Sequence, residues 1–257
     1  MLQCPPVFSP RAVLALFLLI GCAGGPSPNV RIETGPVSEG VRLHARPERE
    51  FHPAEPGLRR LGLASPRDAL LFVPEAARTR RVPLLVMFHG AGGSAAHIWP
   101  TVRSDAEEHG VAVLMPESRQ WSWDYKLGDF GDDRRFIDAA LAETFRRVPV
   151  DAGHVAVGGF SAGATMALSL GTSNGDLFGW VFAFSPTAIV VMGQAGHPRF
   201  LVAHGLQDTL VPIASSSRAI VPALRSAGYS VVYRELPGEH EVFPEAVHEA
   251  LSLLVSD

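Results

Sequence analysis

From residue 84 onward, short apolar runs alternate with longer segments in which apolar residues recur at helical spacing. The runs 84–88 and 111–115 are apolar throughout, which is typical of strands buried on both faces of a sheet. Pro100 interrupts the helix expected over 95–109 or marks its start. Residues 41–74 show a weaker strand-like pattern, clearest at 69–73. The remaining expected strands are 155–158, 180–184, 199–203 and 230–235, and the remaining expected helices are 132–147, one ending near 171, 213–227 and 244–255.

This alternation of strands and helices predicts an α/β fold, in which a mostly parallel central sheet has helices on both faces. In such sheets ligands bind beyond the carboxyl ends of the strands, so chemistry is sought in the loops that follow them. The 257 residues are enough for one such domain with a large core. We see no internal repeat.

The amino-terminal residues have the pattern of an export signal. Arg11 precedes an apolar run at 12–20 that is too short to span a membrane, and the segment ends in Leu-Ile-Gly-Cys at 19–22. This ending resembles a bacterial lipobox, in which the cysteine, here Cys22, is lipidated and becomes the first mature residue. An ordinary secretory signal cleaved nearby, or an uncleaved anchor, is the alternative. We therefore expect a signal peptide over 1–22, a flexible tether over 23–40 and one domain over 41–257.

Composition and charge narrow the classes of partner and cofactor that fit this chain. The chain is 47% hydrophobic and 19% charged, with a net charge of −4 and no basic block, which argues against nucleic acid as a partner. Both cysteines, Cys4 and Cys22, lie in or at the end of the leader, so the domain holds no disulfide. No His-Glu-x-x-His motif or cysteine–histidine cluster is present, and we expect neither a metal nor a cofactor. A lipid on Cys22 would tether the exported domain to a bacterial membrane, on the periplasmic side or at the cell surface. The oligomeric state is left open.

The most specific motif is Gly-Phe-Ser-Ala-Gly at 159–163, which follows the strand 155–158 and opens a helix. A G-x-S-x-G turn between a strand and a helix is the nucleophile elbow of the α/β-hydrolase fold. The turn raises the Ser161 hydroxyl above the sheet, at the positive end of the following helix. Ser161 is therefore the candidate nucleophile.

A serine nucleophile needs a base, and the base needs an acid that orients it. In this fold the chain order is serine, then aspartate or glutamate, then histidine. Asp208 follows the strand 199–203, and His240 lies between the last strand and the last helix, so both fit this order. Each alone also has a structural reading, as a turn residue and a solvated loop histidine. We expect His204 to pack beneath the Asp208 loop rather than act as base.

A loop that stabilises the oxyanion belongs after the strand 84–88, where the chain reads His-Gly-Ala-Gly-Gly at 89–93. The candidate donors are the backbone N–H of Ala91, or of its neighbour Gly92, and that of Ala162. His89 is expected to brace this loop. The alternative is a glycine-rich turn that binds nothing.

Taken together, His-Gly-Ala-Gly-Gly, Gly-Phe-Ser-Ala-Gly, the His-Gly-x-x-Asp at 204–208 and Gly-Glu-His-Glu at 238–241 resemble the bacterial phospholipase/carboxylesterase branch of the α/β-hydrolases. Poly(3-hydroxybutyrate) depolymerase-like and feruloyl esterase-like relatives are also similar. The resemblance covers residues 83–257 and implies that Ser161, Asp208 and His240 form the catalytic triad of a cofactor-independent serine ester hydrolase.

The substrate is less defined. Trp121, Trp123 and Tyr125 lie in the loop after the strand 111–115 and are candidates for an apolar wall around the substrate, although such aromatics more often cap a core. No long insertion forms a lid, which favours small or short-chain esters. Polyester or feruloyl ester hydrolysis is the alternative, and a non-catalytic surface lipoprotein or a serine peptidase is less favoured.

Overall fold

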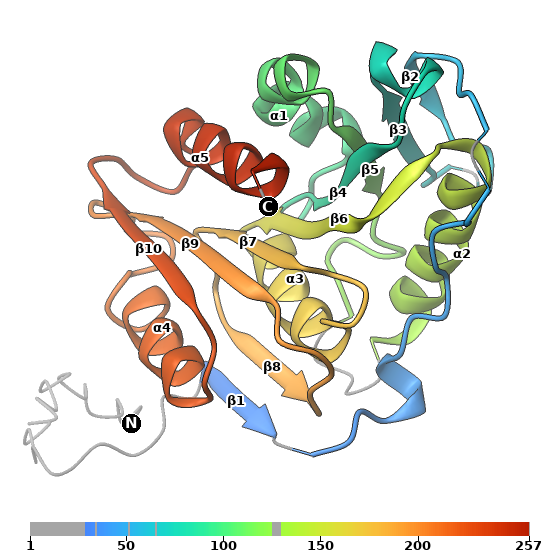
Figure 1. Ribbon diagram of the computed structural model, residues 1–257. Coiled ribbons are helices and arrows are strands. Elements are labelled where there is room, and N and C mark those ends of the chain that lie inside the picture. Colours follow the sequence, from blue (N-terminus) through green and yellow to red (C-terminus); the bar gives the residue numbers. More distant parts are fainter. Residues whose placement is uncertain (1–28, 34, 51, 65, 125–129, 257) are drawn as a thin grey trace, which may run out of the picture.

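An eight-stranded sheet forms the centre of the computed structural model, which describes residues 29–256 apart from 34, 51, 65 and 125–129 (Figure 1). The strand order across the sheet is β10-β9-β7-β6-β4-β5-β3-β2. The strands are β2 (Gly57–Arg60), β3 (Ala69–Val73), β4 (Val82–Phe88), β5 (Ala112–Pro116), β6 (Val150–Phe160), β7 (Trp180–Phe184), β9 (Arg199–Gly205) and β10 (Val231–Leu236).

The sheet is parallel from β10 to β5, and only β3 and β2 run antiparallel to their neighbours. Two 3₁₀ turns, Glu39–Val41 and Glu75–Arg78, flank the antiparallel edge in the chain. All residues of β4, β5 and β7 are buried, as expected for strands covered on both faces.

Helices cover both faces of the sheet (Figure 1). α1 (Ala95–His109) and α5 (Pro244–Val255) pack against each other on one face, above a core that includes Met87 and Phe182. The other face carries α2 (Gly131–Arg147), α3 (Ala162–Ser173) and α4 (Ser217–Ser226), over a core that includes Phe88 and Phe200. The expected fold class, a mostly parallel sheet between two helical layers, is confirmed.

Three elements differ from the sequence expectation, either in where they begin or in how they accommodate a proline. α1 runs through Pro100 without a break, and its start is capped by Ser94, whose side chain accepts the His97 N–H. α4 begins at Ser217 rather than at 213, because residues 213–216 form turns. β6 extends from Val150 to Phe160, longer than the apolar run 155–158.

The structure corrects part of the expected tether. Residues 30–33 form β1 (Val30–Glu33), which pairs in parallel with β8 (Ile189–Met192) to make a separate two-stranded sheet. Val30 and Ile32 pack against the core, so this part of the chain is ordered by the domain. The expected signal peptide and Cys22 lie outside the described residues. None of the helices in the described part of the chain combines the length and hydropathy that a membrane span requires.

Candidate active site

Ser161 lies in the turn between β6 and α3 with a strained backbone. Its φ of 55° and ψ of −119° fall where residues with a Cβ rarely lie, at a cost of roughly 1–3 kcal/mol. The Ser161 N–H donates to the Phe184 carbonyl at 2.9 Å, which ties the turn to β7. The hydrogen bond to β7 therefore keeps the strained turn in place, and the turn raises the Ser161 hydroxyl above the carboxyl end of β6.

Gly163 permits the close approach of α3 to β4. A Cβ at Gly163 would lie 2.5 Å from the carbonyl oxygens of Phe88 and His89, well inside van der Waals contact. The second glycine of the motif therefore brings the serine turn against the first residue of the His-Gly-Ala-Gly-Gly loop.

His240 connects Ser161 to Asp208. Its Nε2 lies 2.9 Å from the Ser161 Oγ, and its Nδ1 lies 2.6 Å from the Asp208 Oδ2. An ionised Asp208 accepts the Nδ1–H, which leaves the Nε2 lone pair to accept the serine proton. The Phe160 ring packs against the imidazole at 4.8 Å between centroids. The structure thus brings together the three residues that the chain order predicted.

The Asp208 side chain is fully buried, and its carboxylate accepts several hydrogen bonds. Burial raises the pKa of its carboxyl group, but the Val211 N–H at 2.7 Å and the His240 imidazole outweigh this effect, and the net pKa lies below the ordinary value. His204 also contacts Oδ2 through its Nε2, at 3.1 Å. Asp208 is therefore ionised in the neutral range.

His204 lies under the Asp208 loop, as expected from its place at the end of β9. Its Nε2 faces two acceptors, Asp208 Oδ2 and the Val211 carbonyl at 2.9 Å, so Nε2 carries the proton. Its Nδ1 then accepts from the Ser217 hydroxyl at 2.7 Å. Burial lowers the pKa of His204 and keeps it neutral, in a position that supports the acid rather than reaching the serine.

Two backbone N–H groups beside Ser161 lack an acceptor within the described residues. Of the two alternatives in the loop, the Gly92 N–H donates to the Trp121 carbonyl at 2.7 Å, and the Ala91 N–H has no such partner. Ala162 is the first residue of α3, so its N–H is one of the unpaired donors of that helix. Ala91 and Ala162 are thus the available pair of donors.

A cavity of about 420 Å³ opens between the His-Gly-Ala-Gly-Gly loop, the first turns of α1 and the loop after β10. The side chains of Ile98, Phe160 and Val242 form an apolar part of its lining, and His240 also lines it. The residues that line it are His89, Gly90, Ala91, Gly93, His97, Ile98, Thr101, Phe160, His240, Glu241 and Val242.

The tryptophans considered for a substrate wall do not line this cavity. Trp123 is buried, donates its Nε1–H to the His89 carbonyl at 2.8 Å and packs on the rings of Phe88 and His89. Trp121 is 73% exposed and lies over Gly92. Both contact the loop at 89–93, and Tyr125 lies outside the described residues.

His89, Ala91 and His240 were singled out from the sequence, but Ile98, Thr101 and Val242, which also line the cavity, were missed by sequence reasoning. α1 begins directly after the loop at 89–93, so its first turns lie at the same edge of the sheet as Ser161. Ile98 and Thr101 are three residues apart on that turn and therefore share a face. Val242 carries no comparable signal, because its position depends on how the His240 loop folds back.

One group of side chains in the described part of the chain has the spacing of metal ligands: Asp105, Glu108 and His248, between α1 and α5. The His248 Nδ1 lies 2.8 Å from the Asp105 Oδ1, and both helices are otherwise in contact there. The hydrogen bond between the Asp105 and His248 side chains accounts for this proximity.

The strand order, the serine turn after β6 and the Asp208 and His240 loops after β9 and β10 define an α/β-hydrolase fold. Residues 131–255 match a family model described as Phospholipase/Carboxylesterase. That segment contains Ser161, Asp208 and His240. No curated protein sequence matches the chain significantly.

Solved structures share the fold at low sequence identity. S-formylglutathione hydrolase from Staphylococcus aureus is 13% identical, with a TM-score of 0.61 over 80% of this chain and 98% of the other. A ferulic acid esterase from Anaeromyces mucronatus is 15% identical, with a TM-score of 0.60 over 87% and 97% of the two chains. A phospholipase/carboxylesterase from Dyadobacter fermentans is 20% identical, with a TM-score of 0.55 over 74% and 97%.

Proposed function

We propose that this chain is a serine ester hydrolase that acts through an acyl-enzyme. The observation that carries the proposal is the hydrogen-bonded series Ser161–His240–Asp208 beside two unpaired N–H donors. Ser161 Oγ attacks the ester carbonyl carbon while His240 Nε2 takes the hydroxyl proton, and the Ala91 and Ala162 N–H groups stabilise the oxyanion.

His240 then gives its proton to the leaving alkoxide, so that the ester C–O bond breaks and the acyl group stays on Ser161. A water molecule, deprotonated in turn by His240, attacks the acyl carbonyl, and the acid leaves as Ser161 regains its proton. Every proton transferred passes through His240 Nε2, and no cofactor takes part. Asp208 stabilises the imidazolium formed in each half of the cycle.

The cavity supports a small or short-chain acyl or alkyl group as the substrate. A volume of about 420 Å³ is at the lower end of small-molecule sites, and its apolar wall is formed by Ile98, Phe160 and Val242. Glu241 lines the same cavity and disfavours an anionic substituent there. The Phe160 ring in the wall also makes an aromatic acyl group a reasonable second candidate, for which the similar ferulic acid esterase structure is a precedent.

The test is hydrolysis of p-nitrophenyl esters from acetate to palmitate, together with methyl ferulate, by residues 23–257. We expect turnover of the shorter esters, with kcat/KM falling once the acyl chain exceeds the cavity. Ser161→Ala should abolish turnover of every ester. Equal rates for wild type and Ser161→Ala would overturn the proposal, and a preference for methyl ferulate would favour the feruloyl esterase alternative.

We further propose that the exported protein is lipidated on Cys22 and attached to a bacterial membrane. The Leu-Ile-Gly-Cys ending of the apolar leader supports this. In a bacterial host, the full chain should fractionate with membranes and incorporate radiolabelled palmitate, and Cys22→Ala should do neither. Membrane attachment of Cys22→Ala without label would instead indicate an uncleaved anchor.

A further inference from the structure

The Gly90–Ala91 peptide is held in one orientation by hydrogen bonds to its carbonyl oxygen. The Gly90 oxygen lies 2.7 Å from the His89 Nδ1 and accepts the Gly93 N–H at 3.0 Å. In a trans peptide the C=O and the N–H point in opposite directions. Two donors that fix the Gly90 carbonyl on one side therefore fix the Ala91 N–H on the other. A Cβ built on Gly90 would lie 3.5 Å from the Ser161 Cβ, so this peptide is next to the nucleophile.

The neighbours of His89 determine which ring nitrogen carries its proton. Nε2 accepts the Ser118 N–H at 3.1 Å and lies 3.4 Å from an Arg67 guanidinium nitrogen, so both of its neighbours are donors. Nδ1 faces only the Gly90 carbonyl, an acceptor. The proton is therefore on Nδ1 and is donated to Gly90. The ring is 1% exposed, and burial lowers its pKa to about 4, so His89 is neutral near pH 7.

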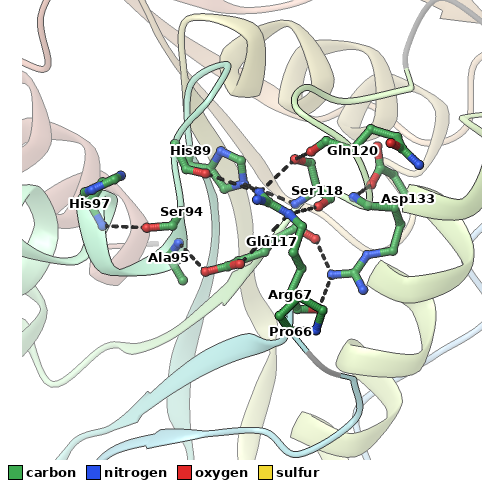
Figure 2. Close-up of polar contacts among 12 residues, drawn as sticks. Pro66, Arg67, His89, Ser94, Ala95, His97, Glu117, Ser118, Gln120 and Asp133 are labelled. Carbon is green, nitrogen blue, oxygen red and sulfur yellow. Dashed lines mark hydrogen bonds and ion pairs between the residues drawn. The ribbon is translucent and has the colours of Figure 1, made fainter.

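Arg67 holds both His89 and the far end of the loop. Its guanidinium donates to the Gly93 carbonyl at 3.2 Å and to the Ser118 hydroxyl at 3.2 Å, and its Nε donates to the Ser118 carbonyl. Arg67 comes from the segment between β2 and β3, His89 follows β4 and Ser118 follows β5. Figure 2 shows these three segments meeting, with the Arg67 guanidinium beside the His89 ring and Ser118.

We propose that His89 is a positioning residue for ester hydrolysis, which holds the Gly90–Ala91 peptide so that the Ala91 N–H is available to the oxyanion at Ser161, with Arg67 fixing the loop from behind. This inference rests on the proposed function. Loss of the Nδ1 donor frees the peptide to rotate, and the Ala91 N–H is then no longer preorganised. The loss falls on the transition state, because the oxyanion exists only there and in the tetrahedral intermediates.

The test compares His89→Leu with His89→Asn. Leucine removes both ring nitrogens, whereas the Asn Nδ2 can take the place of Nδ1 and donate to the Gly90 carbonyl. We expect kcat of His89→Leu to fall by about 10²- to 10³-fold with KM changed by less than about threefold, as for the loss of one oxyanion donor. His89→Asn should recover at least about tenfold of this loss.

A second measurement separates positioning from general structure. A trifluoromethyl ketone inhibitor forms a tetrahedral adduct that carries the oxyanion, so its affinity should fall with kcat in His89→Leu, whereas the affinity of the carboxylic acid product should not. His109→Leu is the matched control, because His109 also makes two hydrogen bonds, at the other end of α1. Its kcat should stay at the wild-type value.

If His89→Leu does not fold, Arg67→Gln decides the question, because Arg67 is only partly buried. Arg67→Gln should lower kcat and trifluoromethyl ketone affinity together, by at least about tenfold. Folded variants with wild-type kcat, or a lower kcat with unchanged inhibitor affinity, would overturn the positioning role while leaving the esterase intact. Persistence of wild-type activity in Ser161→Ala would instead overturn the proposed function itself.

Discussion

At the scale of single residues, the candidate site assigns each imidazole a different task through its neighbours. His240 lies between a hydroxyl and a carboxylate, His204 donates to the carboxylate from below, and His89 donates to a backbone carbonyl. Of these three, only His240 has its Nε2 within hydrogen-bonding distance of Ser161. In the proposed mechanism, histidine thus serves as base, as support for the acid and as support for the oxyanion loop, and the hydrogen-bond partners distinguish the three roles.

Asp208→Asn should lower kcat by about 10³- to 10⁴-fold while the protein stays folded. An asparagine can still accept the Val211 N–H, but its amide nitrogen facing His240 would favour the imidazole tautomer with the proton on Nε2, which cannot accept from Ser161. The measurement is kcat for a short p-nitrophenyl ester. Glu239→Gln is the control, because Glu239 also flanks His240 but is exposed. A larger loss in Glu239→Gln than in Asp208→Asn would contradict the assignment of the acid.

The low pKa of His89 predicts a pH-dependent stability. The unfolded chain takes up a proton at His89 near pH 6.5 and the folded chain only near pH 4, so this contribution is complete above 6.5 and is lost as the pH falls toward 4. The full loss is roughly 3 kcal/mol. The measurement is the free energy of unfolding in urea at pH 7.5 and 4.5, for wild type and His89→Asn.

The pH-dependent loss of stability should be smaller in His89→Asn than in wild type. The comparison must be made between these two proteins, because burial raises the pKa of Asp133 to about 6 and that group stabilises the fold on acidification over the same range. Asp133 is common to both proteins and cancels in the difference. Identical pH dependences would show that His89 is not a buried neutral imidazole.

At the scale of elements, the end of β9 and the loop after β10 pack so closely that a methyl group at Gly205 does not fit between them. A Cβ on Gly205 would lie 2.1 Å from the Glu239 carbonyl oxygen and 2.5 Å from that of Gly238. Gly205→Ala must therefore push the His240 loop away from Asp208. We expect kcat to fall by about 10²-fold, as for a displacement of about 1 Å, and the free energy of unfolding to fall by about 1–3 kcal/mol.

Gly153→Ala is the control for this element-scale prediction. A Cβ on Gly153 would meet only the Asp151 carboxylate, at an ordinary contact distance of 3.6 Å. Its kcat for the same ester should match that of wild type. Wild-type kcat in a folded Gly205→Ala protein would mean that the two loops adjust without separating His240 from Asp208.

The elements that sequence reasoning predicted are those whose signals are local. The apolar runs of β4, β5 and β7 and the serine turn are each read within a few residues, and the order of Ser161, Asp208 and His240 follows from the fold. β8 and the role of Arg67 have no local signal. β8 pairs with a strand almost 160 residues earlier in the chain, and Arg67 acts on a loop after a different strand. Contacts of this kind depend on how the elements assemble.

At the scale of the whole molecule, residues 29–33, which precede the 3₁₀ turn at 39–41, pack against the domain and do not form a free tether. β1 pairs with β8 (Figure 1). The Asn29 side chain donates to the Ser215 carbonyl just before α4. Ile189 and Val191 of β8 are fully buried. If Cys22 carries a lipid, only the short segment between Cys22 and residue 29 separates that lipid from the first described residue.

This arrangement predicts that residues 29–40 contribute to stability. Removing them exposes the buried side of β8, and residues 41–257 should unfold in urea with a free energy lower than that of residues 23–257 by about 2–4 kcal/mol. Within β1 the side chains alternate, with Ile32 half-buried toward the core and Arg31 exposed. Ile32→Ser should therefore cost about 1 kcal/mol and Arg31→Ser almost nothing. Equal stability of Ile32→Ser and Arg31→Ser would mean that β1 does not pack on the domain in solution, and the tether would then extend to residue 40 as the composition of the segment suggested.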